Sequence, residues 1–255
     1  MTSLTSPPAI ESDIFYPSSD SEPLAETSDH VLALLTIFAV LTQYLQGQQA
    51  IVLADQFFYY SQGFPRLRVA PDVMVVFNVS SGSRDNYKLW EEGEIPSVVF
   101  EVTSNGTQDR DQGFKLGLYE QLGVSEYWLF DPKNEWIEGQ LQGYRLQNDA
   151  YVPVSEPVSE ALGLRLAVEG KLLGFYRVDS GERLLIPDEL AAALKTESQR
   201  RLEAEEQAEA ERQRAEAERQ RAETERQRAE TLESQLAAYR ERFGELNGDT
   251  SEPST

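Results

Sequence analysis

Cysteine is absent from this 255-residue sequence, and no Lys or Arg precedes Arg66. The first absence excludes disulfide bonds and thiolate metal sites and suits a reducing compartment. The second argues against a secretory signal, which needs a basic start. The longest apolar run, residues 31–41, is too short and too interrupted to cross a bilayer. We therefore expect a soluble, cytoplasmic protein with no membrane partner.

Positive charge is also scarce, and the formal net charge is −21. Residues 1–190 carry 12 basic and 28 acidic side chains, a charge of −16, and residues 191–255 account for the other −5. Affinity for DNA comes largely from Lys and Arg side chains that neutralise phosphates. The main part of the chain should therefore bind bare DNA weakly unless its few cations cluster around a site.

Composition divides the chain into four parts. Residues 1–13 are rich in Ser, Thr and Pro and are expected to be a disordered lead-in. Residues 14–186 are expected to form one globular domain, for which the length is sufficient. Residues 187–246 predict a long charged helix, and residues 247–255 a disordered tail.

Two acidic residues lie in or beside apolar runs. Asp72 directly precedes the run 73–77, and Glu101 lies inside the run 98–102. Runs that are apolar on both faces are typical of central strands covered on both sides. A carboxylate there needs a cation or a donor, and Mg²⁺, which often takes only one or two carboxylates, is one such partner. The alternatives are that Asp72 simply starts a strand and that Glu101 pairs with an arginine across the sheet.

A helix expected at residues 109–121 supplies a third component. Asp111, Lys115 and Tyr119 are spaced four apart and share one helical face. If that face looks toward the strand ends, Lys115 lies near both acids. A metal held by two carboxylates, with a lysine that stabilises developing negative charge, suits phosphodiester hydrolysis. Taken alone, Lys115 would be a solvated helix residue.

Several segments carry a resemblance to one known family: 70–73, 87–93, 100–104, the Asp111/Lys115/Tyr119 helix and 123–128. From about residue 16 to 190 the chain resembles the Uma-two family of restriction endonucleases, within the PD-(D/E)XK nuclease superfamily. The resemblance implies a mixed α/β (α+β) fold with a restriction-endonuclease-like αβββαβ core. It also implies Asp72 and Glu101 as metal ligands and Lys115 as the catalytic lysine. The superfamily's lysine position, two residues after the strand glutamate, is Thr103 here, and the family's lysine in the following helix fits Lys115.

A first helix is expected at residues 26–46, with Thr27, Ser28 or Asp29 as its cap. Glu26 and His30 would share one of its faces. The resemblance places Glu26 near the metal, and the alternative is an acid favoured by the helix dipole. His30, the only histidine, is expected to pack or hydrogen-bond rather than to catalyse. The expected core stripe is Val31, Leu34, Leu35, Phe38, Leu41 and Leu45.

The remaining segments of the domain are short. Strands are expected at 50–54 and 57–60, and the polar loop 80–88 carries Arg84 and Lys88, which are either phosphate contacts or plain surface charge. After Pro132, five short segments separated by Gly and Pro predict antiparallel hairpins that extend the sheet. They are 136–139, 143–146, 151–154, 164–168 and 172–176.

A seven-residue repeat marks the charged region: 210–216 recurs at 217–223 and, with one change, at 224–230. A 3–4 apolar seam is present only at residues 229–246. Glu–Arg pairs, each worth about 0.2–0.5 kcal/mol, would hold the middle of the helix. The helix is either a solitary spacer or a coiled coil that joins copies of the chain into a homo-oligomer through residues 229–246.

Two functions follow. The first is a metal-dependent endonuclease that hydrolyses phosphodiester bonds in DNA, with Asp72 and Glu101 holding Mg²⁺ or Mn²⁺ and Lys115 stabilising the transition state. Glu26, Asp111 and Tyr119 would support them, and RNA is not distinguished from DNA as the substrate. The second is a catalytically weak or inactive nuclease-fold interaction module, assembled through the C-terminal coiled coil and favoured by the acidity of the domain.

Overall fold

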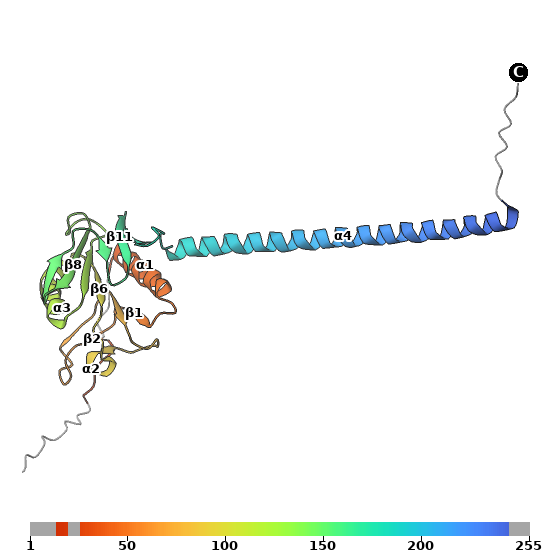
Figure 1. Cartoon of the computed structure of the whole chain (residues 1–255). Coiled ribbons are helices and arrows are strands. Elements are labelled where there is room, and N and C mark those ends of the chain that lie inside the picture. The colour runs from red at the N-terminus through yellow and green to blue at the C-terminus, as the bar shows by residue number, and fades with distance from the viewer. Residues whose placement is uncertain (1–13, 20–25, 245–255) are drawn as a thin grey trace, which may run out of the picture. The chain divides into compact units, whose positions relative to one another are not determined.

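The structure is a computed structural model that describes residues 14–19 and 26–244 (Figure 1). The expected lead-in, 1–13, and tail, 247–255, lie outside the described residues. The chain forms two compact units, 1–190 and 191–255, which are described separately. The expected domain end at residue 186 immediately precedes the first residue of the long C-terminal helix, Pro187.

The main sheet has six strands in the order β1-β4-β6-β7-β8-β9. Strands β6 and β7 are parallel, and all other neighbours are antiparallel. The parallel pair is joined by a helical crossover made of η1 (Arg110–Lys115) and α3 (Leu116–Leu122). The strands are β1 (Ala50–Ala54), β4 (Val73–Phe77), β6 (Val98–Val102), β7 (Glu126–Phe130), β8 (Leu141–Gln147) and β9 (Ala150–Pro153). With α1 (Ser28–Tyr44) in front, the order α1, β1, β4, β6, α3, β7 is the predicted αβββαβ core, so the predicted fold class is confirmed.

The central strands are buried on both faces because two separate apolar clusters cover them. Alternate side chains of one strand, such as Val98 and Phe100, pack on the α1 side, and Val99 packs on the α3 side. Helices α1 and α3 accordingly flank the sheet from opposite sides (Figure 1). All five residues of β6 are buried, Glu101 included. The continuous apolar runs in the sequence therefore mark central strands, as predicted.

The second half of the domain differs in part from the predicted hairpins. Strands β8 and β9 do extend the main sheet, but residues 136–139 form turns. Strands β10 (Val158–Ser159), β11 (Leu164–Glu169) and β12 (Leu172–Arg177) form a sheet of their own. Its inward side chains, such as Leu166 and Phe175, are needed in the cluster on the α1 side, so these strands cover the main sheet instead of extending it.

A further small sheet has the order β3-β2-β5. It combines β2 (Phe58–Tyr59), β3 (Arg68–Val69) and β5 (Tyr87–Lys88), and the short helix α2 (Leu89–Glu92) follows directly. The strand predicted at 57–60 is thus present but lies outside the main sheet.

Helix α1 begins after Thr27, whose side chain accepts a hydrogen bond from the backbone N–H of His30. The predicted core stripe was right at Leu41 and Leu45, which are buried, and at Leu34 and Phe38, which are partly buried against the core. It was wrong at Val31 and Leu35, which are 43% and 53% exposed. The buried residues of α1 also include His30, Ala33, Thr36, Ile37 and Val40. Apolar residues occur on more than one side of this helix, so hydrophobicity alone did not determine which side packs on the sheet.

Helix α4 (Pro187–Phe243) has 57 residues and is a single long helix, as predicted. Its ion pairs include Arg201–Glu205 and Arg226–Glu230, both at i, i+4 spacing. Leu232, Leu236 and Tyr239 of the predicted seam are each more than half exposed. Among the helices of the described residues, none combines the length and the apolar character needed to cross a membrane.

Candidate active site

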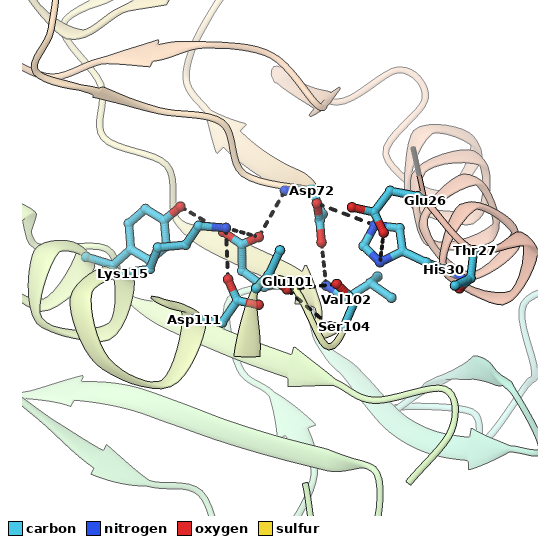
Figure 2. A network of polar contacts seen from close by, with 11 residues as sticks. Glu26, Thr27, His30, Asp72, Glu101, Val102, Ser104, Asp111 and Lys115 are labelled. Carbon is cyan, nitrogen blue, oxygen red and sulfur yellow. Dashed lines mark hydrogen bonds and ion pairs between the residues drawn. The ribbon is translucent and has the colours of Figure 1, made fainter. Parts of the chain in front are cut away.

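Asp72 and Glu101 lie side by side because of the register of two central strands. Val73 of β4 pairs with Phe100 of β6, so the next pair along this ladder is Asp72 and Glu101. The backbone N–H of Asp72 donates to Glu101 Oε2 (3.3 Å), and Asp72 Oδ2 accepts from the N–H of Val102 (2.6 Å). Figure 2 shows the two carboxyl groups next to each other above β6. The strand pairing therefore brings together the two acids that the sequence singled out.

The crossover helix brings Lys115 to the same point. Lys115 Nζ lies 2.7 Å from Glu101 Oε2 and 3.0 Å from Asp111 Oδ1. Tyr119 donates its hydroxyl to Glu101 Oε1 at 2.9 Å. The predicted common face of Asp111, Lys115 and Tyr119 is therefore turned toward the strands, and Figure 2 shows Asp111 and Lys115 beside Glu101. Glu101 and Tyr119 are fully buried, and Asp111 and Lys115 nearly so.

The backbone that carries Lys115 differs from the expected continuous α-helix. Residues Arg110–Lys115 form a π-helical turn, and only Leu116–Leu122 are α-helical. π-Helical turns are rare and frequently occur at functional sites. Tyr127, on strand β7, donates its hydroxyl to the backbone carbonyl of Asp111 at 3.0 Å and so ties this turn to the sheet. The sequence analysis did not identify this role of Tyr127.

The buried charges are unequal in number, with three carboxylates around one ammonium. Burial raises the pKa of Asp72 to about 7 and that of Glu101 to about 8, although the nearby Lys115 charge lowers both. Desolvation lowers the pKa of Lys115, but Glu101, Asp111 and Asp72 outweigh it and raise that pKa above its ordinary value. Lys115 therefore stays charged, while the carboxyl pair keeps a proton near neutral pH in the metal-free protein.

His30 and Glu26 lie on the other side of Asp72. His30 Nε2 is 3.8 Å from Asp72 Oδ1, and Nδ1 is 3.7 Å from Glu26 Oε2. These distances exceed normal hydrogen-bond lengths, and His30 Nδ1 is buried without a hydrogen-bond partner in the described part of the chain. Glu26 thus lies on the imidazole side of Asp72 (Figure 2).

Arg84 and Lys88, the candidate phosphate contacts, form ion pairs with acidic side chains near them in the sequence. Arg84 pairs with Glu92, and Lys88 Nζ lies 3.0 Å from Glu91 Oε1. Both cations line a separate recess together with Tyr16. The structure therefore favours the surface-charge interpretation of Arg84 and Lys88.

The donor set fits a hard divalent cation with few protein ligands. Asp72 Oδ1 accepts no hydrogen bond from the residues that the structure describes, and Glu101 lies directly beside it. Two adjacent carboxylates, one of which has an oxygen that accepts no hydrogen bond from the described part of the chain (Asp72 Oδ1), suit Mg²⁺ or Mn²⁺, which prefer oxygen ligands, and Mg²⁺ usually keeps several waters. Within residues 14–19 and 26–244, no cluster of three or more His, Asp or Glu side chains has a metal-binding arrangement. Asp72 and Glu101 are thus the residues that could hold such an ion.

Comparisons with known proteins identify the family of the chain. Residues 21–170 match the model of the Uma2 family, which is described as "Putative restriction endonuclease". A solved structure described as "a putative nuclease belonging to DUF820 from Anabaena variabilis" is 14% identical, with a TM-score of 0.40 over 54% of this chain and 72% of that one. No curated protein matches the chain. The family match covers more than half of the sequence, and the chain belongs to the Uma2 family.

Proposed function

We propose that this protein is a metal-dependent endonuclease that hydrolyses phosphodiester bonds in DNA. The observation that carries the proposal is the placement of Glu101. Its carboxylate is fully buried in a central strand, lies beside Asp72, and has Lys115 Nζ at 2.7 Å. A buried carboxylate pair with one lysine is costly to maintain for stability alone, whereas phosphodiester hydrolysis uses all three groups.

Each residue of the cluster has a separate task in this proposal. Asp72 and Glu101 would hold Mg²⁺ or Mn²⁺, which when bound supplies Lewis-acid stabilisation and a more acidic water. The ammonium group of Lys115 stabilises negative charge that develops on the scissile phosphate. Asp111 keeps Lys115 in position when Glu101 shares its charge with the ion, and Tyr119 fixes the orientation of Glu101.

Cleavage of supercoiled plasmid in Mg²⁺ or Mn²⁺ tests this function. We expect the wild type to nick or linearise the plasmid, Glu101→Gln to abolish cutting, and Lys115→Met to lower its rate about 10²–10³-fold. Glu126→Gln is the matched control, since Glu126 is an equally buried strand carboxylate that pairs with Arg145 instead. Equal cutting by the wild type and Glu101→Gln would overturn the proposal.

Acidity favours a second candidate, an interaction module that has the nuclease fold but little or no activity. Residues 1–190 carry a charge of −16, which opposes the binding of any polyanion. A folded wild type that binds Mn²⁺ but cuts neither plasmid DNA nor RNA at low salt would favour this candidate.

In either case we propose that the exposed seam of α4 pairs with a second copy of the chain. Leu232, Leu236 and Tyr239 recur at 3–4 spacing and are 64%, 51% and 56% exposed in the single chain, as expected for a coiled-coil seam. Light scattering of the full chain should give an oligomer, and Leu232→Glu with Leu236→Glu should give a monomer. A wild type that stays monomeric at high concentration would contradict this pairing and favour α4 as a solitary spacer helix.

A further inference from the structure

A small recess adjoins the candidate active site on the His30 side. Three segments line it: the start of α1 with His30, residues 103–105 after β6, and the loop 131–136 after β7. Two of the lining side chains contain buried polar atoms without hydrogen-bond partners among the described residues, His30 Nδ1 and Thr103 Oγ1. His30 and Thr103 are only 5% and 3% exposed.

Unpaired buried polar atoms require an explanation. Each costs the free energy of removing it from water without a replacement bond, and native proteins contain few of them. Here two of them belong to residues that line the same recess from different segments, α1 and the stretch that follows β6. A polar ligand in the recess would supply the partner that Thr103 Oγ1 lacks, whereas His30 Nδ1 faces Glu26 Oε2 at 3.7 Å.

Trp136 supplies an aromatic wall at the rim of the recess. It is 37% exposed, and its loop is fixed by Asp131. The Asp131 carboxylate accepts hydrogen bonds from the backbone N–H groups of Lys133, Trp136 and Ile137 at 3.0, 2.5 and 3.1 Å. A half-exposed indole on a fixed loop is suited to stacking against a flat ring, and such stacking holds nucleobases in single-stranded sites.

Part of the acidic charge around the recess is compensated, although Glu26 and Asp72 lie close to His30. The three N–H groups compensate the charge of Asp131, and Asp29 pairs with Lys171 at 2.8 Å. Within the described residues, Lys133 and Glu135 make no ion pairs and oppose each other in sign. An acidic protein that binds nucleic acid needs a source of affinity other than phosphate neutralisation, and base stacking is such a source.

We infer that this recess binds an unpaired nucleobase next to the scissile phosphate, so that the substrate is single-stranded or locally unpaired nucleic acid. The inference rests on the proposed nuclease function and names its substrate class. His30 links the two sites, because its Nε2 faces Asp72 (Figure 2) and its side chain also lines the recess. The base edge meets Thr103, and its ring stacks on Trp136.

Fluorescence anisotropy in EDTA tests the inference without cleavage. The probes are a short labelled oligo(dT) and a blunt duplex of equal length at low salt. The wild type should bind the single strand about tenfold more tightly than the duplex, and Trp136→Ala should remove that preference. Trp136→Phe should retain most of it, and Phe64→Ala, which removes an exposed ring outside the recess, should retain all of it.

Thr103→Val separates recognition from folding, because valine has the same shape but lacks the unpaired hydroxyl. It should weaken oligo(dT) binding about threefold without lowering the melting temperature. The inference is overturned if the duplex binds as tightly as the single strand, or if Trp136→Ala and Thr103→Val both bind oligo(dT) like the wild type.

The result also separates the two proposals. Metal-dependent cutting of plasmid, with no preference for single strands that depends on Trp136, would refute base binding at the recess and support the nuclease function. Binding of oligo(dT) that depends on Trp136, with no cutting in Mg²⁺ or Mn²⁺, would support base binding at the recess and refute the nuclease function.

Discussion

Asp72 separates two halves of one polar network, and the halves are built differently. On the Lys115 side, the contacts of Glu101 with Lys115 and Tyr119 are 2.7 and 2.9 Å long. On the His30 side, the distances from the imidazole to Asp72 and Glu26 are 3.8 and 3.7 Å. The Lys115 side has short contacts to Glu101 and a 3.0 Å ion pair between Lys115 and Asp111, although Asp111 Oδ2 has no hydrogen-bond partner among the described residues. The His30 side has only the longer distances, and His30 Nδ1 has no hydrogen-bond partner in the described part of the chain.

This difference indicates separate roles for the two halves. The Lys115 side is preorganised, since its charged groups are already oriented by one another and need little rearrangement when a substrate binds. The His30 side lacks partners that a ligand can provide. A variant on the Lys115 side should therefore affect both stability and chemistry, whereas a variant on the His30 side should affect binding more than folding.

The largest effect on stability is expected for Lys115→Met. Removing the ammonium leaves Glu101 and Asp111 buried without a counter-charge. Removal of one partner of a buried ion pair lowers the free energy of unfolding by about 3–5 kcal/mol. Urea unfolding of the metal-free protein measures this cost, with His30→Asn as the comparison on the open side. Equal destabilisation by the two variants would contradict the distinction between the halves.

A smaller loss is expected for Tyr119→Phe. The change deletes only the hydroxyl that donates to Glu101 Oε1, and a hydrogen bond to a charged group contributes about 1.5–3 kcal/mol. Tyr144→Phe is a suitable control, because that hydroxyl accepts from the neutral amide of Gln142. Urea unfolding should rank Tyr119→Phe as the more destabilising of the two.

The pH dependence of stability tests the carboxyl pair. The folded-state pKa values of Asp72 and Glu101, about 7 and about 8, lie above their ordinary values. Their contribution to the stability of the metal-free protein is therefore fully present below about pH 4 and is lost as the pH rises through 7 to 8. The loss is at most about 1.4 kcal/mol per pH unit for each proton. Asp72→Asn should flatten the dependence between about pH 4 and 8, and an unchanged profile would show that the pKa of Asp72 is not raised in the folded protein.

The smallest effect on stability is expected for Thr103→Val on the open side. Since Thr103 Oγ1 has no hydrogen-bond partner, its removal should leave the free energy of unfolding unchanged or raise it by about 1 kcal/mol. Thermal unfolding of Thr103→Val and of the wild type under the same conditions measures this change in stability. Destabilisation by more than about 1 kcal/mol would mean that the hydroxyl supports the fold.

Much of the site could be predicted from sequence because its residues lie in regular elements. Apolar runs marked β4 and β6, and the acids next to or within them meet through the strand register. The spacing of Asp111, Lys115 and Tyr119 remained informative although half of that segment is π-helical. The family resemblance also pointed to Lys115, because Thr103 occupies the lysine position of the wider superfamily.

Other features depend on tertiary contacts that no local pattern encodes. The buried face of α1 was mispredicted in part because the helix has apolar residues on several sides. Ala33 and Ile37 pack toward the sheet, whereas Val31 and Leu35 are exposed. The separate sheet of β10, β11 and β12 depends on which face of the core was still uncovered. The recess beside His30 arises where three distant segments meet, so its unpaired atoms are visible only in the folded chain.

The most direct test of the proposed metal-dependent nuclease is a calorimetric titration of Mn²⁺ into the metal-free protein above pH 8, where both carboxyls of the pair are ionised. The proposal predicts one site in the wild type, its loss in Asp72→Asn and Glu101→Gln, and its retention in Glu126→Gln. Undiminished binding of Mn²⁺ by Asp72→Asn and Glu101→Gln would contradict the assignment of the metal to this carboxyl pair.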